Sequence, residues 1–219
     1  VADLTADKLR ETVRLCNESG SDTRGYALNV TDEAAVEDAF CRVAQDFGAL
    51  DGLINNAGVN ADALLVKRDG GEIGKMSLAD FNKVLQVNLV GVFLCGREAA
   101  VHMLALGRGG VLINISSIAQ VGNIGQSNYA AAKAGVSAMT VTWAQELAQY
   151  GIRVAGIAPG FTSTPMVARM KPAMQDRFRQ RIPLRRFAEP VEIAHAAAFI
   201  LENDYFSGRI LEIDGGLRL

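Results

Sequence analysis

The chain has 219 residues, of which 49% are hydrophobic and 21% are charged, and its formal net charge at pH 7 is −2. This length is sufficient for one sizeable hydrophobic core, and the composition gives no reason to expect a second domain. A net charge so close to zero argues against nucleic acid or an anionic lipid surface as a partner.

No apolar run reaches the roughly 20 residues that a membrane-spanning helix needs, and the first residues lack the pattern of a signal peptide. We therefore expect no membrane partner. The cysteines are odd in number and far apart, which argues against a disulfide framework or a zinc knuckle. They are Cys16, Cys41 and Cys95. We expect a cytoplasmic protein without a bound metal.

Strand and helix patterns alternate along the chain from its first residues, which have the pattern of a strand end. Short apolar runs between turn residues predict strands, and apolar residues at helical spacing predict helices. Strands are expected at 25–30, 50–55, 111–115, 152–157 and 210–213, and helices at 7–18, 31–48, 78–106, 125–150 and 190–201. Such alternation is typical of a parallel sheet with helices on both faces.

Local signals refine two of these helices and predict structure at two places between the elements. Either Thr31 or Asp32 could cap the second helix, and Ser77 followed by Asp80 is typical of a capped helix start. The polar turn at 68–72 lies between two short apolar runs and predicts a small hairpin. Residues 161–187 form a loop-and-helix excursion that is rich in arginine.

The residues best suited to chemistry follow the strand at 111–115. This strand ends in Ser116 and Ser117, and the next helix carries Tyr129 and Lys133 four residues apart. That spacing places both side chains on one helical face, about one turn apart. A hydroxyl, a phenol and an ammonium that converge at a strand end form a proton-transfer arrangement.

Four motifs now stand in a fixed order along the chain. They are Asn55-Asn56-Ala57-Gly58, then Asn88, then Ser117 with Tyr129-x-x-x-Lys133, and finally Pro159-Gly160. This ordered set resembles the short-chain dehydrogenase/reductase family, and within it the bacterial 3-oxoacyl-(acyl carrier protein) reductases. The resemblance extends over nearly the whole chain.

The resemblance implies a single Rossmann-like, doubly wound α/β domain over residues 1–219, with a mostly parallel seven-stranded sheet once a missing first strand is restored. It also implies an NAD(P)-dependent enzyme that interconverts a ketone and a secondary alcohol. The substrate would be most like a 3-oxoacyl thioester, either small or bound to a carrier protein, while a sugar, polyol or steroid alcohol stays open. Family members are commonly homotetramers.

The resemblance gives each catalytic candidate a role. Tyr129 would exchange a proton with the substrate oxygen, and Ser117 would hydrogen-bond that oxygen. Lys133 would favour the phenolate form of Tyr129, since a neighbouring ammonium lowers the pKa of a phenol, and would also hold the nicotinamide ribose. Asn88 would anchor a water chain to Lys133.

The serine assignment has an alternative. In the family the serine usually precedes the tyrosine by 13 positions, and this count selects Ser116. The strand register selects Ser117 instead and implies one deletion between Ala119 and Gly122. Since side chains of a strand alternate between faces, only one of the two serines can point into the site, and we favour Ser117.

The resemblance also implies a cofactor-binding set along the strand ends. Asp3 at the end of the family's second strand would accept the ribose hydroxyls of NAD and repel the 2′-phosphate of NADP. This favours NAD without excluding NADP. The remaining residues of the set are Asn29, Val30, Asn56, Ala57, Gly58, Tyr129, Lys133, Pro159, Gly160, Thr162 and Thr164.

One family feature is absent from the sequence. The Gly-x-x-x-Gly-x-Gly phosphate loop, which follows the family's first strand, does not occur in these residues. We therefore expect that some 30–40 residues are missing ahead of Val1. Without that central strand its two neighbours would carry unpaired backbone groups in the core.

Competing interpretations stay open for several features. A non-catalytic dinucleotide-binding or scaffold protein would tolerate the missing loop. The arginines at 177, 179, 181, 185 and 186 are either a solvated or internally paired face, or a docking patch for an acidic carrier protein. Glu192-x-x-His195 has metal-site spacing, but no second such pair accompanies it, so a solvated helix face is the better interpretation.

Overall fold

A computed structural model describes residues 1–168 and 170–219, with only the backbone described at Met166. The strands are β1 Ala2–Asp3, β2 Tyr26–Ala27, β3 Gly52–Asn55, β4 Val66–Asp69, β5 Glu72–Lys75, β6 Gly110–Ile115, β7 Ile152–Pro159 and β8 Ile210–Ile213. The helices are α1 Ala6–Glu18, α2 Glu33–Phe47, α3 Leu78–Leu85, α4 Gly91–Ala105, α5 Ser127–Leu147, α6 Pro165–Ala168, α7 Pro172–Arg181 and α8 Pro190–Glu202.

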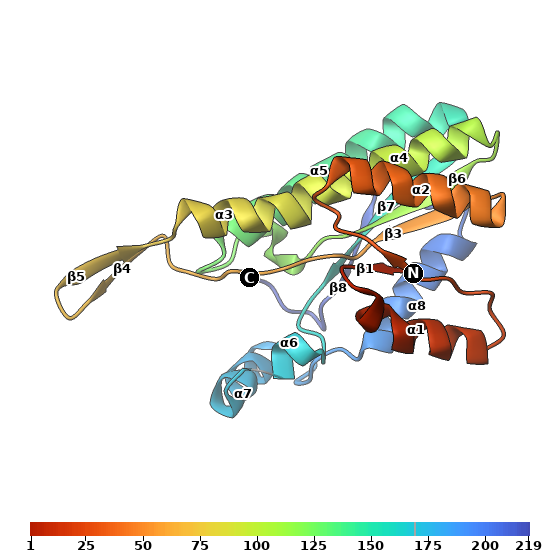
Figure 1. Ribbon diagram of the computed structural model, residues 1–219. Coiled ribbons are helices and arrows are strands. Elements are labelled where there is room, and N and C mark those ends of the chain that lie inside the picture. The colour runs from red at the N-terminus through yellow and green to blue at the C-terminus, as the bar shows by residue number, and fades with distance from the viewer. Residues whose placement is uncertain (169) are drawn as a thin grey trace.

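The centre of the fold is a parallel four-stranded sheet in the order β3-β6-β7-β8 (Figure 1). Its strands are short runs of β-branched and other apolar residues, as strands covered on both faces require. In β6, Leu112 pairs with Leu53 of β3 and with Val154 of β7. All four carboxyl ends meet at one edge of the sheet.

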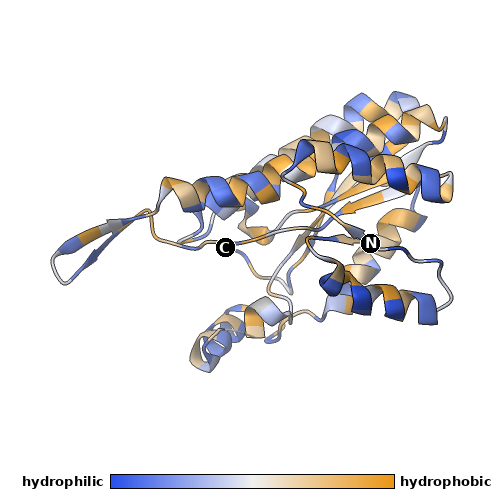
Figure 2. Cartoon of the chain, viewed as in Figure 1, coloured by the Kyte–Doolittle hydropathy of each residue, from blue (hydrophilic) through white to orange (hydrophobic). Residues whose placement is uncertain are grey.

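Helices cover both faces of this sheet, so the predicted doubly wound α/β class is confirmed. On one face, α2 and α4 pack with Leu112 and Val154 in a hydrophobic cluster. On the other face, Ile113 and Ile157 pack against Ile200 of α8. Figure 2 shows hydrophobic residues concentrated on the central strands, whereas α1 is largely hydrophilic. Only Leu9 of α1 is buried.

The sequence analysis expects seven strands once a first strand is restored between its two neighbours, and in the described residues the sheet is divided. β1 and β2 pair with each other in parallel and form a separate two-stranded sheet. The strand expected at 25–30 is also shorter, covering only Tyr26–Ala27. The side chain of Ile54 in β3, the edge strand of the larger sheet, is 46% exposed. No described strand pairs with the edge of β3 that does not face β6.

Helix termini and the hairpin form where the local signals predict them. Of the two candidate caps, Asp32 accepts a hydrogen bond from the Ala35 N–H, and α2 ends at Gly48 with φ 63°. Ser77 accepts from the Asp80 N–H at the start of α3. β4 and β5 form the antiparallel hairpin, which projects away from the body of the molecule (Figure 1).

The helix expected at 78–106 is interrupted by a π-helical turn at Gln86–Val90. Its residues Leu78–Ala105 are long and apolar enough by composition to span a membrane. The expectation that no such stretch exists is therefore wrong. In this structure the helix lies along α5 and α2 over the sheet (Figure 1), and α4 buries Met103, Leu94 and Ala99 in the core. It is a core helix of this fold.

The excursion at 161–187 forms the short helix α6 and the helix α7 beyond the carboxyl edge of the sheet. Its aromatic rings pack together, with the centroids of Phe161 and Phe178 4.3 Å apart. Both rings join a cluster with Ile118, Phe187 and Leu217. Hydrophobic packing thus attaches this excursion to the end of β6 and to the C-terminal residues.

Candidate active site

The two serines after β6 point to different surroundings. Ser116 is 2% exposed, and its hydroxyl lies 3.0 Å from the Lys133 carbonyl oxygen and 2.8 Å from the Ser137 hydroxyl. Ser117 is half-buried and accepts a hydrogen bond from the Ala119 N–H at 3.1 Å. Ser116 therefore ties β6 to α5, whereas Ser117 lies at the surface of the site.

Tyr129 and Ser117 come together as the spacing predicts. The phenol of Tyr129 is half-buried, and this burial raises its pKa above the ordinary value of 10.0, while the Ser117 hydroxyl beside it acts in the opposite direction. Asp62 adds a smaller upward shift of that pKa. The shift favours the protonated phenol, which is also the ordinary form of a tyrosine at neutral pH.

Lys133 lies on the same face of α5 and is almost completely buried. Its Nζ donates to the Ile115 carbonyl oxygen at 2.7 Å and lies 5.7 Å from the centroid of the Tyr129 ring. Burial lowers the pKa of Lys133 to about 8. The pKa of Tyr129 is raised and not lowered as expected, because burial of the phenol is the largest influence on it.

Asn88 lies fully buried in the π-helical turn between α3 and α4. Its Oδ1 accepts from the Val59 N–H at 2.8 Å, and its Nδ2 donates to the Val59 carbonyl oxygen at 2.8 Å. Single π-helical turns occur frequently at functional sites. Both polar atoms of the amide are thus used to hold the loop that follows β3, and the side chain itself does not reach Lys133.

Two of the predicted cofactor-binding segments follow the carboxyl ends of β3 and β7. Asn56, Ala57 and Gly58 follow β3 and are exposed. A Cβ at Gly160, after β7, would lie 2.8 Å from the Asp214 Cα, so only glycine allows these two backbones to pass so closely. In parallel sheets, ligands bind beyond the carboxyl ends of the strands, and these residues fit such a site.

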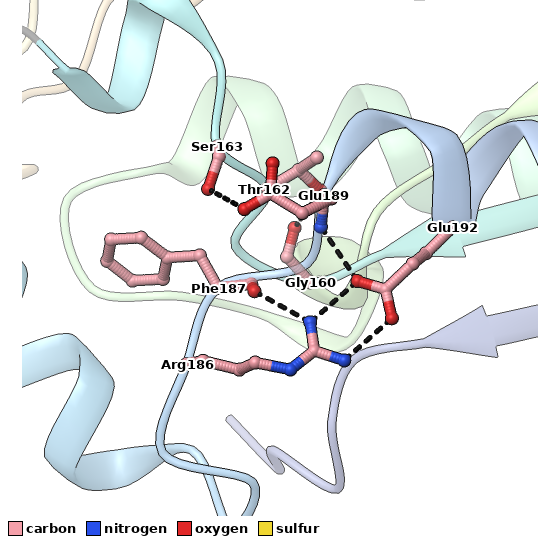
Figure 3. A network of polar contacts seen from close by, with 7 residues as sticks. All are labelled: Gly160, Thr162, Ser163, Arg186, Phe187, Glu189 and Glu192. Atoms are coloured by element: carbon pink, nitrogen blue, oxygen red, sulfur yellow. Dashed lines mark hydrogen bonds and ion pairs between the residues drawn. The ribbon is translucent and has the colours of Figure 1, made fainter.

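Thr162 and Thr164 lie on a loop that is strapped to the start of α8. The Ser163 N–H donates to the Ala188 carbonyl oxygen at 2.8 Å. Thr162 and Ala188 also form an isolated parallel β-bridge. Figure 3 shows that Arg186 forms a two-pronged ion pair with Glu192 below this loop.

Glu192 also accepts from the Glu189 N–H at 2.8 Å, which completes the cap of α8. The Arg186 guanidinium, together with that N–H, lowers the pKa of Glu192 to about 2. Glu192 is therefore a capping residue. Among the described residues, no group of three or more His, Cys, Asp or Glu side chains is placed to hold a metal ion.

Asp3, Asn29 and Val30 lie at the ends of β1 and β2, away from the catalytic candidates in sequence. The Asp3 carboxylate accepts from the Leu4 N–H at 2.6 Å and lies 3.5 Å from the Lys8 ammonium. Asn29 is exposed and accepts from the Thr31 hydroxyl. Val30 instead packs against Gly91 of α4, where a Cβ would come within 2.7 Å of it.

Two buried polar groups were not identified from the sequence, one at the site and one inside the fold between the sheet and α5. Asn128, just before Tyr129, is fully buried and joins three segments. Asn55, Asn114 and Thr140 form a buried hydrogen-bonded chain from β3 through β6 to α5. Asn55 belongs to the recognised Asn-Asn-Ala-Gly motif, and Asn128 adjoins a recognised residue, but neither has a sequence signal of its own.

Comparison with known proteins decides the family. Residues 1–218 match a family model described as enoyl-(acyl carrier protein) reductase. The 3-oxoacyl-(acyl-carrier-protein) reductase FabG of Thermotoga maritima is 39% identical over 218 residues, which are 98% of this chain and 85% of the relative. The chain belongs to the short-chain dehydrogenase/reductase family.

Other family members agree in sequence and in fold. The 3-oxoacyl-(acyl-carrier-protein) reductase of Rattus norvegicus is 35% identical over 217 residues, covering 99% of this chain and 86% of the relative. A solved 7α-hydroxysteroid dehydrogenase in complex with NADH and a 7-oxo bile acid superposes with a TM-score of 0.90 at 29% identity, covering all of this chain and 83% of the other.

A putative gluconate dehydrogenase from Agrobacterium tumefaciens gives a TM-score of 0.89 at 30% identity, covering 98% and 83% of the two chains. As a short-chain dehydrogenase/reductase, this protein is an NAD(P)-dependent oxidoreductase that acts on CH–OH groups and the corresponding ketones.

Proposed function

We propose that this short-chain dehydrogenase/reductase reduces a 3-oxoacyl thioester to the corresponding alcohol, with Tyr129 as the proton donor. The observation that carries the proposal is the meeting of Ser117, Tyr129 and Lys133 at the carboxyl end of β6. Two named relatives act on 3-oxoacyl groups held by a carrier protein, which supports this substrate class.

The chemistry of the site fits reduction at neutral pH. The nicotinamide cofactor supplies the hydride that adds to the carbonyl carbon. Tyr129 gives its phenolic proton to the carbonyl oxygen, and this phenol is protonated at neutral pH. The Ser117 hydroxyl donates a hydrogen bond to the same oxygen and orients it. The nearby Lys133 ammonium stabilises the negative charge of the phenolate that Tyr129 becomes.

The chain's own residues fit the nicotinamide half of the cofactor. Asn56, Ala57 and Gly58 would line one side, and the backbone after Pro159 and Gly160 the other, with Thr162 and Thr164 beyond. Asn88 holds the first of these loops through Val59. The phosphate-binding loop is not among the 219 residues.

We propose NAD as the preferred cofactor because Asp3 ends β1. A carboxylate there accepts ribose hydroxyls and repels a 2′-phosphate. The Lys8 ammonium 3.5 Å from Asp3 partly neutralises that repulsion, so the preference should be moderate. The test measures kcat/KM with NADH and with NADPH in the wild type and in Asp3→Ser. The value for NADH divided by the value for NADPH should be smaller in the variant.

A homotetramer in the cytoplasm is part of the same proposal, in line with the family resemblance. Exposed apolar residues on α4, among them Phe93, Val101 and Leu104, provide a surface for a second copy. Carrier docking by the arginines of α7 and the segment after it is supported less, because Arg179 pairs with Asp176 and Arg186 with Glu192. Light scattering of the purified protein measures the assembly directly.

One assay tests the activity. The protein is incubated with NADH or NADPH and a panel of acyl thioester, sugar and steroid ketones. We expect turnover of the acyl thioesters, a loss of about a thousandfold or more in Tyr129→Phe because the proton donor is removed, and little change in Tyr150→Phe. If a sugar or steroid ketone is reduced faster than the acyl thioesters, the substrate class is different from the one proposed. The two solved neighbours are named for such substrates.

A scaffold protein that binds dinucleotide without chemistry is the alternative from another class. It predicts quenching or enhancement of NADH fluorescence without turnover of any ketone in the panel. Active wild-type protein together with inactive Tyr129→Phe overturns it.

A further inference from the structure

Asn128 is a fully buried amide whose polar atoms all meet backbone groups. Its Nδ2 donates to the Ala61 carbonyl oxygen at 2.9 Å and to the Asp80 carbonyl oxygen at 3.3 Å, while its Oδ1 accepts from the Tyr129 N–H at 2.8 Å. Ala61 is 67 residues away in the chain and Asp80 is 48 residues away. One side chain therefore joins the loop after β3, the first turn of α3 and the first turn of α5.

Each of these three segments belongs to the site. The loop at 59–63 continues from Asn56–Ala57–Gly58, α3 leads into the π-helical turn of Asn88, and α5 carries Tyr129 and Lys133. We propose that Asn128 is a positioning residue that fixes Tyr129 at its working distance from the cofactor-facing loop. This inference rests on the proposed function of Tyr129.

The first turn of α5 needs such support. The first N–H groups of any helix lack partners within the helix, and Gln126 at the N-cap makes no side-chain capping bond. The Tyr129 N–H is one of these groups, and Asn128 satisfies it. Without this bond the first turn, which carries the phenol, would be free to fray.

Other bonds align the same two loops but do not hold α3. The Ala63 N–H donates to the Gly125 carbonyl oxygen at 2.9 Å, and the Gln126 amide donates to Asp62 at 3.0 Å. These contacts should keep the loops together when Asn128 is replaced. We therefore expect a displaced Tyr129 in a folded protein.

This position needs a side chain that both donates and accepts hydrogen bonds. Leucine has similar volume but would leave the Ala61 and Asp80 carbonyl oxygens and the Tyr129 N–H without this partner. An aspartate keeps the acceptor for Tyr129 but sets a carboxylate oxygen against two carbonyl oxygens. A protonated aspartate can donate to the Ala61 carbonyl again, so Asn128→Asp should regain function as the pH falls, whereas Asn128→Leu should not.

The test compares Asn128→Leu and Asn128→Asp with Thr140→Val. Thr140 is a matched control, since it is also buried on α5 and hydrogen-bonded, to Asn114, but lies three turns from Tyr129. We expect kcat for ketone reduction to fall roughly 10- to 100-fold in Asn128→Leu, because small displacements of a reacting group cost this much. The KM for the dinucleotide should stay within about threefold, and kcat should stay near wild type in Thr140→Val.

A second measurement does not require turnover. The chain has four tyrosines, so NMR of tyrosine labelled at Cζ can follow Tyr129, assigned with Tyr129→Phe. Ser117, Lys133 and Asp62 are the polar and charged groups that face this phenol. In Asn128→Leu the pKa of Tyr129 should move down towards its ordinary value as the ring becomes solvated, while Thr140→Val leaves it in place.

The outcomes separate this proposal from the proposed function. If the wild type reduces no ketone, the proposed function is wrong. The NMR titration still decides whether Asn128 holds Tyr129. The positioning role is overturned if Asn128→Leu keeps the wild-type pKa of Tyr129 and wild-type kcat. It is equally overturned if Thr140→Val, at a similar loss of melting temperature, reproduces both changes.

Discussion

At the scale of single residues, the buried ammonium of Lys133 should make the stability of the protein depend on pH. Its pKa is about 8 in the folded protein and 10.5 when unfolded. The unfolded chain thus binds this proton more tightly, so burial of the charge costs stability below pH 8. That cost disappears as the pH rises from about 8 to 10.5.

Lys133→Met should remove this dependence, because the variant has no charge to bury. We expect the free energy of unfolding of the variant, minus that of the wild type, to fall between pH 8 and 10.5. Its slope should be at most about 1.4 kcal/mol per pH unit, the limit for one proton. Urea unfolding at several pH values measures it. The exposed Lys75→Met serves as the control, and an equal slope there would contradict the assignment to Lys133.

At the scale of elements, α4 and α5 approach closely through glycines. A Cβ at Gly96 of α4 would come within 2.6 Å of the Trp143 ring on α5, and a Cβ at Gly135 of α5 within 2.7 Å of a Leu89 methyl group. The Trp143 ring is rigid and partly buried against the main core, whereas a leucine methyl can rotate away. The two glycines should therefore differ in their tolerance of alanine.

We predict that Gly96→Ala destabilises the protein even though alanine favours helices. Overpacking typically costs about 1–3 kcal/mol, against a gain of about 1 kcal/mol in helix propensity. Urea unfolding should show a net loss for Gly96→Ala and a smaller loss, or none, for Gly135→Ala. Adding Trp143→Phe, which lacks the clashing ring atoms, should reduce the cost of Gly96→Ala. If Trp143→Phe leaves the cost of Gly96→Ala unchanged, the helices can move apart to accommodate the added methyl group.

The same elements show what local sequence patterns predict. The cap candidates at Thr31 or Asp32, the cap at Ser77, the helix end at Gly48 and the hairpin turn all depend on residues within four positions of one another, and all were predicted. The π-helical turn and the role of Asn128 depend on partners many residues away, Val59 and Ala61. Such partners become neighbours only through the tertiary fold, so no window of sequence contains their signal.

At the scale of the whole molecule, alternation of strands and helices was sufficient to predict the doubly wound class. The ordered motifs likewise predicted that Ser117, Tyr129 and Lys133 come together. Strand length was predicted less well, since the strand expected at 25–30 covers only Tyr26–Ala27, and β1–β2 do not join the larger sheet. Pairing depends on which neighbour is present, and the propensity of one strand does not contain that information.

We propose that a further strand pairs between β1 and β3 and carries the phosphate loop into the site. An NADH fluorescence titration of the 219-residue chain should then show weak binding. Fusing a strand–Gly-x-x-x-Gly-x-Gly–helix unit ahead of Val1 should tighten it at least tenfold, because the loop's N–H groups and the helix N-terminus bind the pyrophosphate. A fusion with the three loop glycines replaced by alanine is the control, since it restores the strand without the close backbone approach. Full activity in a preparation with an intact mass near 23.4 kDa, the mass of these 219 residues, would contradict the proposal.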